Sequence, residues 1–395
     1  MERIATTLLA AFIGLGFAGE RTAVDSVDPT ISVPARPIAV RGDDGRVHLS
    51  YELHVTDFDP NELRISRIEV LDGAGQNIGE FDEGALQGIL HAFEIDYDRS
   101  LHYDSLGRAH AFHYAGGRGA VAYLWITVSD YSDVPARIEH RLTFSGPGGE
   151  ETPEATIVTG GGMDVGVGHL AVLGGPPLRG GDWLAGQGPG MTPSAHRLSL
   201  IRLDGRLSIA ARFAIDYVRL DEDGRRHTRD GDRNEDYHGY GADVLAIDDG
   251  VVAFATDGIP ENTPGGARAV PLEIGTLGGN SVVLDIGAGL YAHYGHLQPG
   301  LDVKPGDHVR QGDVIGRLGN SGNSNEPHLH FQVSDSRSPY AVVGEGLPYV
   351  HRDFWWIGRC SDGTPVECER SGEDRKNNAI PLQNSVIRFP DQPPR

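Results

Sequence analysis

Short runs of alternating polar and apolar residues recur through most of this chain, and they constrain its fold more than any other feature. Two clear examples are VHLSYELHVT (47–56) and AVAYLWITVSD (120–130), each with Gly, Asp or Arg close to its ends. Because successive side chains of a strand point to opposite faces, such runs are typical of half-buried antiparallel strands. No long stretch has the 3.6-residue periodicity of an amphipathic helix. We therefore predict an all-β protein with few helices.

Linker-like segments divide the predicted strands into two regions. The stretch SGPGGEETPE (145–154) and the glycines at 160–162 have the composition of a connection between domains. The strands at 25–160 predict an N-terminal β-sandwich of immunoglobulin-like type, which we interpret as an accessory domain. The strands at 176–345 predict a second β-rich domain. Residues 346–395 are rich in Pro, Arg and Asp and predict an irregular C-terminal extension that wraps the second domain.

The first 19 residues have the pattern of a secretory signal peptide. Residues 4–19 are apolar, follow Arg3 and end in small residues, and they are shorter than the roughly 20 residues that span a bilayer. We expect an extracytoplasmic protein, periplasmic or secreted, without a membrane span after cleavage; a disordered or membrane-tethering N-terminus is the alternative. In such a compartment the two cysteines, Cys360 and Cys368, favour a local disulfide, although the sequence leaves their pairing open.

The formal net charge of −22 restricts the partners of this chain. Nucleic-acid binding requires a basic surface, and anionic membranes attract basic rather than acidic segments. The charge therefore argues against both partners. Nothing in the sequence indicates an oligomeric state.

A histidine pair, His328-Leu329-His330, lies in the strand-like run EPHLHFQV. Residues two apart on a strand share a face, so both imidazoles can serve one site while Leu329 faces a core. The upstream run YAHYGHL adds His293 and His296. A catalytic zinc ion commonly has three protein ligands and one position for water, and a neighbouring histidine can handle the proton of that water. The four histidines therefore indicate a candidate zinc-hydrolase site.

The order of the motifs resembles the lysostaphin/LytM-type zinc metallopeptidases. Each run alone is common, and the resemblance rests on their succession: GADVLAIDDGVV, NSVVLDIGAGLYAHYGHLQPG, VKPGDHVRQGDVIGRLGNSG and PHLHFQV. The resemblance implies a groove-bearing antiparallel β fold known as the duplicated hybrid motif. It also implies a zinc-dependent endopeptidase whose substrates are peptide cross-links or stem peptides of bacterial peptidoglycan.

The same resemblance implies roles for individual histidines. The second histidine of the family's pair binds zinc, which here is His330, and the first, His328, acts in catalysis. The histidine of the family's Tyr-x-His-Leu motif is the other catalytic residue, which here is His296. His293 has a similar context and is the fallback for that role. Because His293 and His296 are three positions apart on a predicted strand, we expect their side chains to face opposite ways.

Two His/Asp pairs compete to complete the zinc site. In the family, a His-x-x-x-Asp motif precedes a Val-x-Ala-x-x-x-Gly-x-Val strand pair, which here is VLAIDDGVV. His238 and Asp243 precede that run closely, but four residues separate them. Asp216 in RFAIDYV has the family's apolar-Asp-aromatic context, and His196 in TPSAHRLSLI is its candidate partner, with a charged, loop-like insertion at 219–239. We favour His196 and Asp216 and keep the other pair as the alternative.

Three functions fit these motifs. The first is a zinc metalloendopeptidase of peptidoglycan, with Zn²⁺ held by His196, Asp216 and His330. The second is a catalytically inactive relative that binds peptidoglycan or activates another hydrolase; retention of all three histidines of the family's motifs argues against it. The third is a lipoyl- or biotinyl-type carrier, suggested by KPGDHVRQGDVIG, but Lys304 precedes Pro305 at a strand entrance rather than at a hairpin tip. The sequence does not indicate which peptide bond is cleaved.

Overall fold

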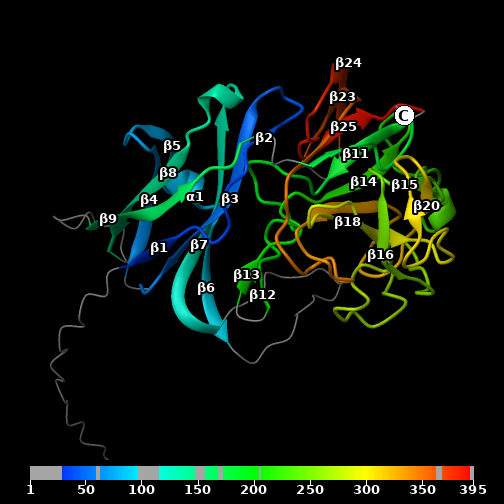
Figure 1. The fold of residues 1–395 in the computed structure, drawn as a ribbon, viewed down its shortest axis with the longest axis horizontal. Coiled ribbons are helices and arrows are strands. Elements are labelled where there is room, and N and C mark those ends of the chain that lie inside the picture. Colours follow the sequence, from blue (N-terminus) through cyan, green and yellow to red (C-terminus); the bar gives the residue numbers. More distant parts are fainter. Residues whose placement is uncertain are drawn as a thin grey trace, which may run out of the picture.

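The regular secondary structure of the described part consists almost entirely of β-strands, mostly antiparallel, as predicted (Figure 1). The predicted signal peptide lies outside this part. No helix among the described residues is long and apolar enough to cross a membrane. The computed structural model describes residues 29–58, 63–96, 115–146, 156–167, 172–203, 206–361 and 367–391.

Nine strands form the N-terminal part of the structure. They are β1 (Thr30–Ser32), β2 (Val40–Arg41), β3 (Val47–Thr56), β4 (Arg64–Asp72), β5 (Asn77–Phe81), β6 (Leu90–Asp96), β7 (Ala115–Val128), β8 (Arg137–Ser145) and β9 (Thr156–Asp164). One sheet has the order β1-β3-β7-β6, with β2 paired to β3, and the other has the order β5-β4-β8-β9. The short helix α1 (Glu83–Leu86) begins at Asp82, whose carboxylate accepts the Ala85 N–H at 3.0 Å.

The two N-terminal sheets enclose one apolar core. Leu49 and Leu53 of β3 and Leu124 of β7 share this core with Ile68 of β4 and Phe144 of β8. Their alternation along each strand is the pattern that predicted the strands, because only one face of each sheet meets the core. The structure thus contains two antiparallel sheets around one core, while their immunoglobulin-like type stays a prediction.

Sixteen further strands follow in the described part of the chain. They are β10 (Val172–Gly174), β11 (Asp182–Gly186), β12 (Ile201–Leu203), β13 (Arg206–Ser208), β14 (Ile215–Leu220), β15 (Asp243–Leu245), β16 (Gly250–Thr256), β17 (Asn280–Asp285), β18 (Tyr291–Leu297), β19 (His308–Val309), β20 (Val314–Arg317), β21 (Leu329–Ser334), β22 (Tyr349–His351), β23 (Phe354–Cys360), β24 (Cys368–Lys376) and β25 (Ser385–Arg388). Ten of them form one sheet with the order β19-β16-β17-β18-β21-β14-β11-β25-β23-β24. Three two-stranded pairs, β10-β22, β12-β13 and β15-β20, flank it.

The middle of the ten-stranded sheet brings the predicted site strands side by side. In the antiparallel register, His330 of β21 lies opposite Asp216 of β14 on one side and opposite Gly295 of β18 on the other. The intervening residues Leu329 and Phe331 are fully buried in the apolar core on the opposite face. The period of two therefore separates a polar, site-bearing face from a packed face.

The expectation that residues 346–395 are irregular is wrong. Strands β25, β23 and β24 continue the ten-stranded sheet beyond β11. Two features explain why the alternation of polar and apolar residues did not predict these strands. The β24 run CERSGEDRK is exposed along most of its length, and the pairing of β23 shifts register between Trp356 and Gly358. An exposed edge strand and a bulged strand both lack a regular alternation of apolar and polar residues.

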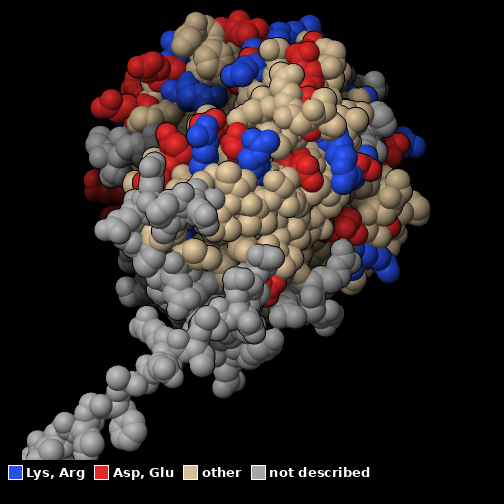
Figure 2. All heavy atoms as spheres, turned by 90° about the vertical axis from the view of Figure 1, so that its left-hand side faces the viewer, with Lys and Arg blue, Asp and Glu red and all other residues tan. Residues whose placement is uncertain are grey.

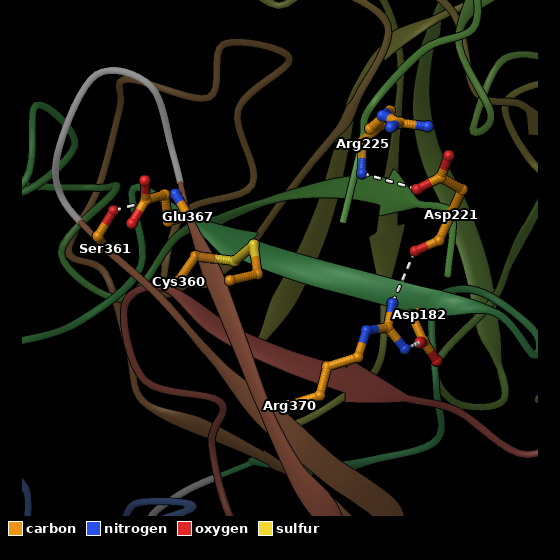
Figure 3. The surroundings of a disulfide bond; sticks show 8 residues. Asp182, Asp221, Arg225, Cys360, Ser361, Glu367 and Arg370 are labelled. Carbon is orange, nitrogen blue, oxygen red and sulfur yellow. Dashed lines mark hydrogen bonds and ion pairs between the residues drawn. A yellow bond between two sulfur atoms is a disulfide. The ribbon is translucent and has the colours of Figure 1, made fainter. Parts of the chain in front are cut away.

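The β23–β24 hairpin carries a disulfide between Cys360 and Cys368, which confirms the expected local pairing (Figure 3). The hairpin is also attached to the body of the sheet by Arg370. The guanidinium group of Arg370 forms an ion pair with Asp182 of β11 and donates to the Asp221 carbonyl at 2.6 Å. The loop that follows β14 is thereby held against the C-terminal hairpin.

The two sheet assemblies meet through the segment that connects β11 to β14. The hairpin β12-β13 of this segment lies between them in Figure 1. Its flanking residues Leu200 and Ile209 pack against Val121 and Tyr123 of β7. The proposed domain ranges 25–160 and 176–345 stay a prediction, but these side chains form a buried apolar part of the contact between the two assemblies.

The surface of the N-terminal assembly carries charges of both signs. Figure 2 shows Lys and Arg side chains beside Asp and Glu side chains on this end of the molecule, around a broad uncharged area. Charges intermixed in this way do not produce the one-signed field that nucleic-acid binding uses. The mixed charges on this face agree with the net charge, which argues against nucleic acid as a partner.

Candidate metal centre

Three predicted metal ligands come together on the polar face of the ten-stranded sheet. The Nδ1 atom of His330 lies 3.0 Å from Oδ1 of Asp216, directly across the β14–β21 pairing. His196 approaches from the connection between β11 and β12, and its Nε2 atom lies 3.3 Å from Oδ2 of Asp216. One potential ligand atom from each of the three residues lies within 4.8 Å of the others. Two imidazole nitrogens and one carboxylate oxygen are the donor set of many catalytic zinc sites, so these residues fit zinc.

The hydrogen bonds of His196 leave the correct ring nitrogen free for a metal. The Nδ1 atom of His196 lies 3.1 Å from the carbonyl oxygen of Gln187. Because a carbonyl oxygen only accepts, Nδ1 carries a proton, and Nε2, the atom nearest Asp216, is the nitrogen that can coordinate an ion once it is deprotonated. The backbone of the loop thereby selects the tautomer of His196 that can coordinate an ion.

Gln332 plays the equivalent part for His330. The Nε2 atom of Gln332 donates to the Ala341 carbonyl at 2.7 Å, so its Oε1 atom is turned toward His330 and lies 2.9 Å from Nε2 of that ring. Nε2 of His330 is then a donor, and Nδ1, the atom nearest Asp216, is the nitrogen that can coordinate an ion. Sequence reasoning missed Gln332. The signal was present, because Gln332 follows His330 by two positions on a strand and must share its face.

The two predicted catalytic histidines lie beside these three residues. The Nε2 atom of His328 is 3.4 Å from Oδ1 of Asp216, while its Nδ1 atom donates to the Glu326 carbonyl at 2.8 Å. The His296 ring is centred 4.7 Å from the His328 ring and 5.8 Å from the His330 ring. Its Nδ1 atom donates to the Ser321 carbonyl at 2.8 Å. Both rings therefore turn Nε2 away from a backbone carbonyl and toward the site.

The expectation that His293 and His296 face opposite ways is wrong. His293 lies opposite Gln332 in the β18–β21 register, so it shares the face of His330, and its Nε2 atom is 3.0 Å from Oγ of Ser334. His296 has a backbone φ of 62°, in the left-handed region that non-glycine residues rarely adopt. This conformation ends the regular alternation and returns the His296 side chain to the same face. Backbone strain of this kind is often retained at functional sites.

The charges of the site perturb its titrating groups in opposite directions. Burial raises the pKa of Asp216, but the neighbouring His196 and His328 outweigh it and hold that pKa well below its usual value. Burial lowers the pKa values of His196 and His328, but Asp216 outweighs it and raises both. For His296, burial acts together with His328 and His330 and holds its pKa well below its usual value. Asp216 is therefore ionised and His296 is neutral near pH 7.

The alternative ligand pair lies outside this cluster. The Nε2 atom of His238 is 3.6 Å from Oδ2 of Asp221, and Oδ1 of Asp243 is 3.4 Å from Nε of Arg317. These partners are separate, so His238 and Asp243 do not share a site in this structure. Among the described residues, the group of ligand atoms that could hold a metal ion consists of His196, Asp216 and His330.

The 219–239 insertion supports the site indirectly. Arg226 of this loop forms an ion pair with Glu326 at 2.6 Å. The backbone carbonyl of Glu326 accepts the Nδ1 proton of His328. The loop therefore helps to hold the segment that orients His328.

Sequence comparison places part of this chain within a known family. The profile of Peptidase family M23 matches residues 236–341. Lysostaphin from Staphylococcus simulans is 36% identical over 119 residues, which cover 29% of this chain and 24% of that protein. Glycyl-glycine endopeptidase ALE-1 from Staphylococcus capitis is 37% identical over 121 residues, which cover 29% of this chain and 33% of that protein. The chain thus spans a third or less of the length of these relatives.

Among solved structures, the catalytic domain of lysostaphin from Staphylococcus simulans aligns with this protein. The TM-score is 0.23 and the sequence identity 21%, over 42% of this chain and 88% of that chain. In this protein, His296, His328 and His330 lie inside the stretch that matches the family profile, whereas His196 and Asp216 precede it. The chain therefore contains a domain of peptidase family M23, homologous over this stretch to lysostaphin and ALE-1.

Proposed function

We propose that the protein is an extracytoplasmic zinc metalloendopeptidase that hydrolyses peptide bonds of bacterial peptidoglycan, in cross-links or stem peptides. The observation that carries this proposal is the convergence of His196, Asp216 and His330. Their ligand atoms lie within 4.8 Å of one another, beside strands of the stretch that matches the M23 profile. The homology to lysostaphin and to a glycyl-glycine endopeptidase supports a peptide substrate. The predicted signal peptide supports the compartment in which peptidoglycan is found.

The ligand residues are arranged to hold an ion without a large rearrangement. Nε2 of His196, a carboxylate oxygen of Asp216 and Nδ1 of His330 lie within 4.8 Å of one another and can bind one ion when both ring nitrogens are deprotonated. Zinc bound there would polarise a substrate carbonyl and lower the pKa of a water molecule toward 7. The hydrogen bonds from His196 to Gln187 and from His330 to Gln332 restrain the rings before any ion is bound.

His328 and His296 supply proton handling and charge stabilisation. Both rings have Nδ1 tied to a backbone carbonyl and Nε2 directed at the site. Nε2 of His328, beside Asp216, can take a proton from the attacking water and return it to the leaving amine. His296 is neutral with its proton on Nδ1, so its Nε2 can accept a hydrogen bond from the water and position it. The imidazolium that His328 becomes on taking the proton can stabilise negative charge that develops on the carbonyl oxygen.

The proposal is tested by the metal content and activity of the purified full-length chain. We expect about one equivalent of zinc per chain, as in other three-ligand hydrolase sites, and hydrolysis of peptidoglycan or a Gly-rich peptide that stops when a chelator removes the metal and resumes when zinc is restored. A zinc content below about 0.1 equivalent after supplementation would contradict the assignment, since a complete site binds zinc tightly. Zinc without hydrolysis of any peptidoglycan preparation would favour the inactive relative.

Replacing Gln332 by alanine is expected to weaken zinc binding about 10- to 100-fold, the effect usual for a residue that orients a metal ligand. The reason is that His330 loses the acceptor at 2.9 Å that selects its tautomer and restrains its ring. The measurement is the zinc dissociation constant by competition with a chromophoric chelator. Gln311→Ala is a matched control, because the Gln311 amide belongs to a different loop and has a buried nitrogen without a partner. Equal zinc affinity in Gln332→Ala and the wild type would show that Gln332 does not restrain His330.

A further inference from the structure

One face of β3 is polar and yet buried. His48, Ser50, Glu52 and His54 alternate with the core residues of this strand, and each is at most 4% exposed. A buried polar face is stable only where other groups cover it and form hydrogen bonds with it. The covering groups therefore indicate what this surface of the N-terminal sheet does.

Part of the cover is the segment that connects β11 to β14, and it binds through two arginines. Arg197, which is 1% exposed, donates to the Tyr51 carbonyl at 2.9 Å and to the Leu124 carbonyl at 2.7 Å, and its Nε atom lies 3.3 Å from Glu52. The Nε atom of Arg212 donates to the other carboxylate oxygen of Glu52 at 2.8 Å. A single buried carboxylate of the N-terminal sheet thus binds two arginines of the connecting segment, one before and one after the β12–β13 hairpin.

This contact is well supported by charge and by packing. Burial raises the pKa of Glu52, but Arg212 and Arg197 outweigh it and lower the pKa, so the carboxylate is ionised. The guanidinium group of Arg197 lies 5.7 Å from the centre of the Tyr123 ring, and Leu200 packs in the same apolar cluster. Removing one partner of such a buried ion pair leaves the other charge without compensation, which is strongly unfavourable.

The consequence concerns His196, which immediately precedes Arg197. Both residues lie in one tight turn, in which Leu198 N–H bonds to the Ser194 carbonyl and Ser199 Oγ donates to the His196 carbonyl at 2.5 Å. Arg197 points into the N-terminal sheet and His196 points toward Asp216. The other two candidate ligands sit on paired strands of the ten-stranded sheet. His196 has no such pairing, and the stretch that matches the M23 profile does not include it.

We propose that the N-terminal sheet is a structural part of the metal centre, in which Glu52 is a positioning residue that acts through Arg197 to hold His196 within reach of the metal. The inference rests on the proposed zinc site and adds to it a dependence on a distant module. Loosening the contact between β3 and the connecting segment should therefore weaken metal binding before the ten-stranded sheet is affected.

The test compares full-length variants that alter this contact with one that alters a different contact between the same two parts. Glu52→Gln and Arg197→Met remove the ion pair, and His196→Ala removes the ligand itself. Asp43→Asn is the control: the Asp43 carboxylate is also buried, and it accepts the Leu382 N–H at 3.1 Å from the C-terminal part, away from His196. Each variant is measured by its zinc dissociation constant, by the visible spectrum of its cobalt(II) form and by thermal unfolding without metal.

We expect Glu52→Gln and Arg197→Met to raise the zinc dissociation constant at least about tenfold, as expected for residues that orient a ligand. Their cobalt spectra should shift toward that of His196→Ala, because the site loses a nitrogen ligand. Asp43→Asn should lower the unfolding temperature but keep the zinc affinity and the cobalt spectrum. Should Glu52→Gln not yield folded protein, Arg197→Lys, which keeps the charge but loses the forked contacts to two carbonyls, carries the same expectation.

Two results would overturn the inference. One is wild-type zinc affinity and an unchanged cobalt spectrum in folded Glu52→Gln, Arg197→Met or Arg197→Lys. The other is an equal loss of zinc affinity in Asp43→Asn, which would show that any loosening of the two parts has this effect. Absence of zinc binding in the wild type would be a different failure, because it would overturn the proposed zinc site itself and this inference with it.

Discussion

Replacing Asp216 by alanine is expected to weaken zinc binding severely and to abolish peptide hydrolysis with it. Asp216 lies at the centre of the site, where its carboxylate is 3.0 Å from Nδ1 of His330, 3.3 Å from Nε2 of His196 and 3.4 Å from Nε2 of His328. The variant loses one ligand and the negative charge that contacts all three imidazoles. Zinc-site free energies of about 10–16 kcal/mol are shared among three or four ligands, so the loss of one corresponds to a weakening on the order of 10³-fold.

The measurement is zinc content after dialysis together with the rate of peptidoglycan hydrolysis. Asp243→Ala is a matched control, since Asp243 belongs to the alternative ligand pair and contacts Arg317 instead. We expect Asp243→Ala to retain about one equivalent of zinc. Retention of zinc by Asp216→Ala and its loss from Asp243→Ala would reverse the assignment and favour His238 and Asp243.

Replacing His328 or His296 by alanine is expected to have the opposite signature: zinc is retained while kcat falls by about 10²- to 10⁴-fold, the contribution usual for general acid–base catalysis. Neither residue belongs to the group whose ligand atoms converge within 4.8 Å. Each instead has one ring nitrogen fixed by a backbone carbonyl and the other turned toward the site. The loss should therefore appear in the rate and not in the metal content.

His293→Ala is the control for this pair of variants. His293 is a buried histidine of β18 whose Nε2 lies 3.0 Å from Oγ of Ser334. Burial, with a smaller contribution from His330, lowers its pKa to about 4. We expect its removal to lower thermal stability through the lost packing and hydrogen bond, with a much smaller effect on kcat. A loss of zinc from His328→Ala would make His328 a ligand. A loss of kcat in His293→Ala as large as in His296→Ala would restore His293 as the catalytic candidate.

Many of the strands could be predicted from the sequence because the signal is local. The alternation in VHLSYELHVT and AVAYLWITVSD reappears in β3 and β7, with apolar residues on the core side of each. His328 and His330 could be placed on one face by counting two residues along a strand. The exposed β24 and the bulged β23 escaped prediction for the same reason, because neither carries a regular alternation.

The composition of the site depended on contacts that no local pattern encodes. His330 and Asp216 are 114 positions apart, and the antiparallel pairing of β14 with β21 makes them neighbours. Sequence spacing kept His238 and Asp243 as an alternative, whereas the structure gives each of them a different partner. A regular strand would have turned His293 and His296 to opposite faces, but the left-handed backbone of His296 places both on one face.

By itself, the sequence determined the all-β class, the motif order that resembles lysostaphin/LytM-type peptidases and the histidine pair at 328 and 330. Only the tertiary structure decided that His196 and Asp216 join His330, that Gln332 holds the ring of His330, and that Glu52 of the N-terminal sheet contacts the turn that carries His196. The physical reason is the range of the interactions. Strand alternation follows from neighbouring residues, whereas the site follows from strand pairing and buried ion pairs between residues far apart in the chain.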